Sequence, residues 1–120
     1  MNRRLLKILV CLVLVLLAAE GVFAARLTQN FTLNNETGET MVVLQIGPAG
    51  TGRWRNEDEL DEFTIASGAS VAVTFEPWED AQYWDIRAYF EDGTYGEWHN
   101  FDLFSISEIT LNKNGVATYR

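Results

Sequence analysis

The chain has 120 residues and is acidic, with 17 Asp and Glu residues against 9 Lys and Arg residues, one cysteine and one histidine. A length of this order predicts a single domain. The negative balance argues against nucleic acid as a partner, because nucleic-acid-binding proteins carry basic patches, and against anionic membrane surfaces. Cations, cationic partners and uncharged glycans remain compatible with the charge.

The N-terminus has the pattern of an export signal. Three basic residues precede an apolar run over residues 8–19, and small residues lead to a cleavage point after Ala24. The run is short of the ~20 residues that cross a bilayer, so we expect no membrane span after cleavage. We therefore predict a signal peptide at 1–24 and a periplasmic or secreted domain at 25–120.

The predicted mature chain is more acidic than the whole. Cleavage removes three of the nine basic residues and one of the seventeen acids, which leaves six minus sixteen, a net charge of −10. It also removes Cys11, so the domain must be stable without a disulfide. A chain of this size buries roughly 60–70% of its unfolded surface, which is enough for a modest core.

Alternation of apolar and polar residues recurs along the mature chain, and no window keeps a helical period. The expected strands, in chain order, cover residues 29–33, 40–46, 71–76, 83–91, 94–98, 106–111 and 116–119. The first strand is expected to stop at Asn34-Asn35, with Thr37-Gly38 completing a turn, and one helical turn near residues 57–62 is compatible with the pattern. Asp92-Gly93 predicts a hairpin with a type I′ turn, and Gly96 predicts a kink in its return strand.

Six to eight strands separated by Gly, Asn and Asp turns predict an all-β fold. The expected architecture is a single antiparallel β-sandwich, Ig-like or related, with a small closed β-barrel as the alternative.

Short motifs follow one another in a fixed order along this chain: Phe31-Thr32-Leu33-Asn34-Asn35-Glu36-Thr37-Gly38, Ile46-Gly47-Pro48, Trp54, Asp58, Leu60, Gly68, Trp84-Asp85-Ile86-Arg87, Asp92-Gly93, Trp98 and Phe101-Asp102-Leu103. The order resembles a family of short exported bacterial proteins with no assigned function. The resemblance covers nearly the whole mature chain and implies bacterial export and a β fold. Its motifs are turn and core residues, so it implies no functional site. Many members carry a cysteine where this chain has Phe104, so any role of that thiol is absent here.

The segment 47–62, GPAGTGRWRNEDELDE, combines glycines, arginines and acids. Its glycines match neither a phosphate-binding loop nor a dinucleotide fingerprint, because no lysine or helix follows them. Trp54 between Arg53 and Arg55 is a candidate contact surface, since Trp and Arg dominate binding hot spots. The alternative is that Trp54 covers one end of the core while the arginines pair with the acids downstream.

The acids of the same segment suggest a second interpretation. Asp58 and Asp61 offer the hard oxygen ligands that calcium prefers, although the spacing does not match an EF-hand. A calcium-stabilised structural component is therefore the alternative function, and a solvated acidic loop is the simpler explanation. No other cofactor is predicted.

The strand over 83–91 presents Tyr83, Asp85, Arg87 and Tyr89 on one face. This polar and aromatic strip is a candidate grip for a peptide or a glycan. A solvent-exposed strand face has the same composition, and Asp85 is also a candidate acceptor for a neighbouring loop.

Catalysis has weak support in this sequence. His99 lies near Asp102, Ser105 and Ser107, but no nucleophile motif is present, and nothing singles out a pair of carboxylates. An enzyme using His99 or a carboxylate pair is therefore the least favoured function. The leading hypothesis is an exported, non-enzymatic binding or interaction module with an unknown protein or glycan partner.

Overall fold

The computed structural model describes residues 29–120, so the predicted signal peptide lies outside the described residues. The strands are β1 (Phe31–Glu36), β2 (Met41–Pro48), β3 (Ser70–Val73), β4 (Tyr83–Phe90), β5 (Tyr95–Asp102), β6 (Glu108–Asn112) and β7 (Ala117–Tyr119), with a short 3₁₀ turn η1 (Lys113–Gly115) before β7. Within this part of the chain, no helix is long and apolar enough to cross a membrane.

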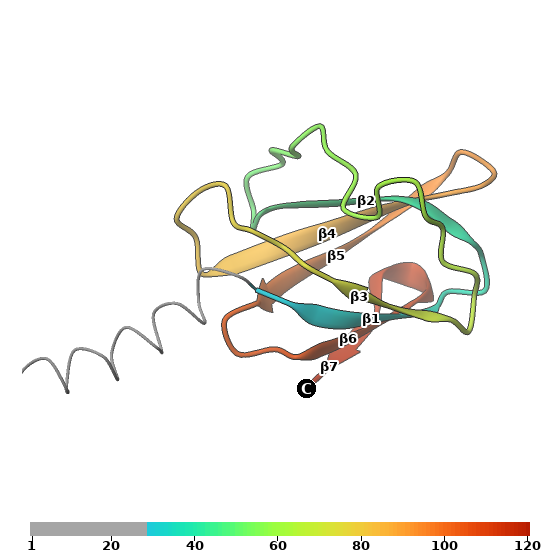
Figure 1. Ribbon diagram of the computed structural model, residues 1–120. Helices are drawn as coiled ribbons and strands as arrows, with labels where there is room; N and C mark the ends of the chain where they lie inside the picture. Colours follow the sequence, from blue (N-terminus) through green and yellow to red (C-terminus); the bar gives the residue numbers. More distant parts are fainter. Residues whose placement is uncertain (1–28) are drawn as a thin grey trace, which may run out of the picture.

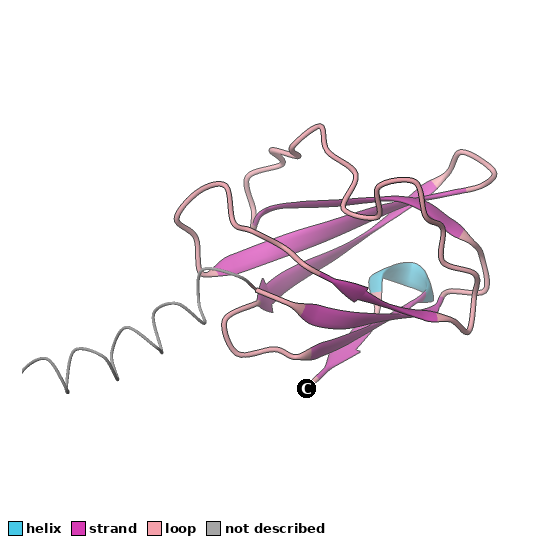
Figure 2. Cartoon of the chain, viewed as in Figure 1, coloured by secondary structure: helices cyan, strands magenta, loops and turns pink. Residues whose placement is uncertain are grey.

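The strands form two sheets that pack face to face (Figures 1 and 2). One has the order β3-β1-β6-β7 and the other the order β2-β4-β5. The sheets do not close into a barrel, so the predicted β-sandwich is confirmed and the barrel alternative is wrong. Most pairs are antiparallel as expected, but β1 and β6 run parallel.

The core lies between the sheets and is built from the inward-facing residues of both. It contains Phe31, Leu33, Met41, Leu44, Ile46, Leu60, Ile65, Val73, Phe75, Trp84, Ile86, Ala88, Phe90, Trp98, Phe101, Leu103, Ile106, Ile109 and Leu111. The rings of Phe75 and Trp84 meet edge to face with centroids 4.9 Å apart. Each large side chain buried in this way stabilises the fold by roughly 1.5–3 kcal/mol. The core therefore replaces the disulfide that the predicted mature chain lacks.

The first strand continues through Asn34-Asn35, so the strand end predicted there is wrong, whereas the bend at residues 37–39 includes the predicted Thr37-Gly38. Asn35 is fully buried. Its side-chain Nδ2 donates to the carbonyls of Glu39 (2.7 Å) and Ile65 (2.8 Å), and its Oδ1 accepts from the backbone N–H (3.0 Å) and the hydroxyl (2.7 Å) of Thr37. The side-chain amide of Asn35 forms hydrogen bonds with backbone groups of the bend that follows β1, while the backbone of Asn35 stays in the strand.

The hairpin predicted at Asp92-Gly93 is present, but its turn is not type I′. A type I′ turn needs positive φ at both central residues, whereas here Gly93 has a φ of 88° and Asp92 is not left-handed. The Phe90 N–H donates to the Thr94 carbonyl at 2.8 Å, which encloses a three-residue loop. The loop pairs Arg87 with Glu97.

The return strand β5 contains a bulge and is longer than predicted. Trp84 pairs with Phe101 and Ile86 with Trp98, so the two residues His99 and Asn100 lie opposite Asp85. Asn100 has a φ of 68°, a left-handed conformation that asparagine tolerates. The extra residue lets both Trp98 and Phe101 face the core, which strict alternation does not allow. The other strands differ from the prediction only at their ends.

At the predicted kink, Gly96 serves a different purpose. A Cβ atom at this glycine would lie 2.9 Å from the ring of Trp98, so the absent side chain makes room for the indole. The segment 57–62 forms turns rather than a helix.

We expect Asn35→Ala to lower the free energy of unfolding by roughly 1–3 kcal/mol, because it removes four side-chain hydrogen bonds and leaves the buried N–H of Thr37 without its acceptor. Chemical denaturation measures the loss. Asn34→Ala is the control on the same strand, since Asn34 points outward to Glu108 and Thr110 and water can replace its bonds. That variant should lose less than about 1 kcal/mol. Equal losses in the two variants would contradict the role given to Asn35.

Candidate binding surface on the three-stranded sheet

The connection between β2 and β3, residues 49–69, rises beside the three-stranded sheet and follows the outer edge of β2 (Figure 1). Oδ1 of Asp58 accepts the N–H of Leu44 at 2.9 Å, and the N–H of Glu59 donates to the Leu44 carbonyl at 2.8 Å. Met41 and Ile65 exchange two backbone hydrogen bonds of 3.0 Å. These contacts satisfy backbone groups that an edge strand would otherwise expose to other chains.

The predicted calcium ligands lie in this edge-covering segment. Oδ1 of Asp58 accepts a second backbone bond, from Leu60 at 2.9 Å, so Asp58 already has a structural role. Asp61 is exposed, with a φ of 56°. Residues 29–120 contain no group of three or more His, Cys, Asp or Glu side chains placed to hold a metal ion. Calcium binding by Asp58 and Asp61 stays a prediction.

The start of the connection folds back tightly over β2 at Gly47. A Cβ atom on Gly47 would lie 2.3 Å from the carbonyl oxygen of Arg53 and 3.3 Å from the ring of Trp54. Only a glycine allows the backbone to approach so closely. This approach sets the position of Trp54 above the outer face of the sheet.

The two arginines beside Trp54 do not form one surface with it. Arg53 makes two hydrogen bonds of 2.7 Å to Glu79, and its guanidinium lies 5.7 Å from the centre of the Trp78 ring. Arg55 lies 5.9 Å from the same ring and pairs with the downstream acid Glu57. Trp54 does not share this contact with Trp78. It is half-buried and lies outside the core, so the alternative in which Trp54 covers one end of the core is wrong.

Arg87 of β4 joins Trp54 to the strip predicted on that strand. Its guanidinium lies 4.6 Å from the centre of the Trp54 ring and 4.9 Å from that of Tyr95. Its Nε and Nη2 donate to the same oxygen of Glu97, Oε2, at 2.9 and 2.6 Å. Burial lowers the pKa of Arg87, but the hydrogen bond and charge of Glu97 more than reverse this, so the net pKa is raised. Trp54 and Arg87, which the sequence placed on two separate candidate surfaces, thus lie on the same surface.

The tyrosines of β4 take different places. The ring of Tyr89 lies 5.5 Å from that of Tyr95, its neighbour on β5, and extends the aromatic surface. Tyr83 is exposed at the first position of the strand and pairs with Asp102, away from Arg87 along the strand. Of the predicted strip, Arg87 and Tyr89 therefore meet Trp54 and Tyr95, whereas Tyr83 does not belong to this cluster.

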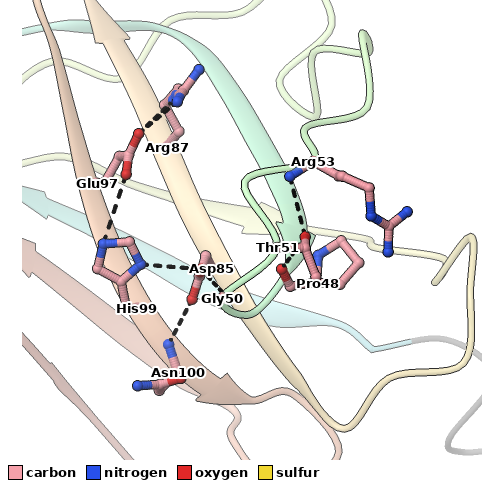
Figure 3. Close-up of polar contacts among 9 residues, drawn as sticks. All are labelled: Pro48, Gly50, Thr51, Arg53, Asp85, Arg87, Glu97, His99 and Asn100. Atoms are coloured by element: carbon pink, nitrogen blue, oxygen red, sulfur yellow. Dashed lines mark hydrogen bonds and ion pairs between the residues drawn. The ribbon is translucent and has the colours of Figure 1, made fainter.

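Asp85 is the structural acceptor that the sequence offered as one alternative. It is only 4% exposed. Its Oδ2 accepts the N–H of Gly50 at 3.0 Å, and its Oδ1 accepts the N–H of Asn100 at 2.9 Å (Figure 3). One carboxylate therefore ties the β2–β3 connection to the bulge of β5.

His99 extends this contact into a polar chain across two strands. Its Nδ1 lies 3.1 Å from Oδ2 of Asp85 and its Nε2 lies 3.7 Å from Oε1 of Glu97. Figure 3 shows the resulting line of side chains, Arg87, Glu97, His99 and Asp85, on adjoining strands. The imidazole is 53% exposed, as expected for a surface residue, but it lies inside β5 rather than at a strand end.

A shallow hollow of about 340 Å³ opens beside the side chains of Asp85, Glu97 and His99. It is lined by Gly50, Gly52 and Trp54 from the connection and by Asp85, Glu97, His99 and Asn100 from the strands. Both glycines have positive φ, and a Cβ on either would meet nothing within 4 Å, so the connection leaves the hollow open. The arrangement combines an aromatic surface with fixed acceptors, which suits binding of a polar ligand.

The sequence alone does not indicate a role for Tyr95, Glu97 or Asn100 in a site. The register of the hairpin is the signal that could have found Tyr95 and Glu97, because these residues lie opposite Tyr89 and Arg87. A three-residue loop gives this pairing and the expected two-residue turn does not. Asn100 had no local signal beyond the tolerance of asparagine for positive φ.

Comparison with known proteins adds little to these findings. No protein-family model matches the chain, and no curated protein matches it either. The solved structures include one similar chain, described as the NMR structure of the protein from Eubacterium rectale. It has a TM-score of 0.47 and 14% sequence identity, over 80% of this chain and 89% of that one. The resemblance to a family of exported bacterial proteins stays a prediction.

Glu59 gives the edge-covering segment a pH dependence. Burial raises the pKa of its carboxyl to about 7, and the charges of Glu57, Asp58 and Asp61 add to this while Arg55 opposes it. A pKa raised in the folded state means that stability is fully present below the ordinary value near 4.5 and falls as the pH rises through about 7.

We expect Glu59→Gln to remove this loss of stability with rising pH. Between pH 5 and pH 8 the unmodified protein should lose about 1–2 kcal/mol relative to the variant, allowing for solvent screening of a carboxyl that is only partly buried. Urea unfolding at both pH values measures the difference. Glu62→Gln, in the same segment but exposed, should leave the fall unchanged. The same fall in the Glu59→Gln variant would contradict the assignment.

Proposed function

We propose that the protein is a small exported binding module that contacts a protein or glycan through the outer face of its three-stranded sheet and catalyses no reaction. The observation that carries the proposal is the contact of Arg87 with the rings of Trp54 and Tyr95, next to a hollow lined by Trp54, Asp85, Glu97 and His99. The partner meets this face directly, because the other sheet packs on the opposite face.

The cluster has the composition and rigidity of a binding surface. Tryptophan, tyrosine and arginine are the residues that contribute most at interfaces, and their flat rings also stack on sugars. Arg87 is fixed by Glu97, and its guanidinium contacts the rings of both Trp54 and Tyr95. A surface fixed before the partner arrives loses less conformational entropy on binding.

The contacts of His99 favour binding over catalysis. A histidine base acts on a nucleophile that lies within hydrogen-bond reach, with a carboxylate orienting its second nitrogen. Asp85 has the orienting position, but the group facing the other nitrogen is Glu97, a carboxylate rather than a hydroxyl or thiol. The arrangement therefore suits recognition of a donor better than activation of a nucleophile.

We expect Trp54→Ala to reduce binding at least tenfold on arrays of peptides and glycans, because it removes the aromatic side of the hollow. Its unfolding free energy should fall by only about 1 kcal/mol, since Trp54 lies outside the core. Phe63→Ala is the control: Phe63 is 71% exposed in the same connection and does not line the hollow. Binding that survives Trp54→Ala, or falls equally in both variants, would contradict the proposed surface.

A further inference from the structure

Glu97 and His99 present two hydrogen-bond acceptors to the hollow. Both Arg87 donors bond to Oε2 of Glu97, while Oε1 faces His99. A carboxylate such as Asp85 can only accept, so the contact of 3.1 Å between its Oδ2 and the Nδ1 of His99 favours the tautomer with the proton on Nδ1. In a neutral imidazole the other nitrogen, Nε2, is then an acceptor as well.

These two acceptors stand side by side without bonding to one another. Oε1 of Glu97 and Nε2 of His99 are 3.7 Å apart, too far for a hydrogen bond, and neither has a proton to give when the imidazole is neutral. A nitrogen donor placed about 2.9 Å from each would satisfy both at once. A primary ammonium group carries three donors on one atom and fits such a converging pair.

The surroundings favour a positive charge at this point. Trp54 lines the same hollow, and an aromatic face attracts a cation. Asp85 and Glu97 contribute two negative charges, and Arg87 is already paired with Glu97 and lies against the rings of Trp54 and Tyr95. The acidic chain as a whole also steers cations toward its surface.

We propose that the hollow binds the ammonium group of a lysine side chain from a polypeptide partner, an inference that rests on the proposed binding function. Lysine fits better than arginine, because the acceptors are on two side chains and converge on one point, whereas a guanidinium matches the parallel oxygens of one carboxylate. Tyr95, 55% exposed beside the hollow, offers contact area to the residues that flank the lysine.

Titration of the purified protein, expressed from its full coding sequence, with the peptide acetyl-Gly-Lys-Gly-amide tests this proposal. The readout is the indole N–H signal of Trp54 in NMR spectra at pH 8, where histidine side chains are ordinarily neutral and lysine is charged. We expect saturable shifts with this peptide and at least tenfold weaker binding with the matched acetyl-lysine peptide. Butylamine, which lacks flanking residues, should bind more weakly than the lysine peptide.

Two glutamates give a matched pair of variants. Glu97 and Glu108 each pair with an arginine, and their side chains are 29% and 28% exposed, but they lie on different sheets. We expect Glu97→Gln to weaken binding of the lysine peptide at least fivefold and Glu108→Gln to change it less than twofold. Unfolding curves of both variants confirm that each is folded.

Equal binding of the lysine and acetyl-lysine peptides, or equal losses in the two Gln variants, would overturn the ammonium site. Butylamine that binds as tightly as the peptide would overturn the choice of a polypeptide partner. If the ammonium site fails while array binding still depends on Trp54, the proposed binding function stands and only the ligand class is wrong.

Discussion

The buried carboxylate of Asp85 is the contact on which the outer face of the three-stranded sheet depends. It accepts the N–H of Gly50 and that of Asn100 and orients His99, so it fixes a loop, a bulge and a side chain together. The contact therefore leaves His99 and Glu97 free to face the hollow.

The edge of β2 imposes the second constraint. Its exposed backbone groups are covered by Asp58, Glu59 and Ile65, so the charge-dense segment that suggested calcium serves first to protect an edge strand. Burial in this segment raises the pKa of Glu59, and the neighbouring acids add to the effect, so this part of the fold is sensitive to pH near neutrality. Covering the edge also brings Trp54 over the face of the sheet, so protection of the edge and formation of the candidate surface are linked.

Small departures from regular pairing decided which side chains meet. A type I′ turn at Asp92-Gly93 would place Arg87 opposite Trp98, whereas the three-residue loop places it opposite Glu97. The ion pair, and with it the acceptor pair of Glu97 and His99, thus depends on one residue in a turn. The bulge at Asn100 has a similar effect, because it turns Phe101 into the core and leaves two successive residues opposite Asp85.

The sequence by itself determined the all-β class, most strands and the inward face of β4, because alternation is a local property that burial of one face imposes. It also marked Trp54, Asp85 and Arg87 as residues of interest. Only the tertiary structure decided that Trp54 lies on Arg87 while its flanking arginines go to Trp78, and that Asp85 is buried. These outcomes depend on contacts between residues distant in the chain and on a single-residue register, neither of which leaves a periodic signal in the sequence.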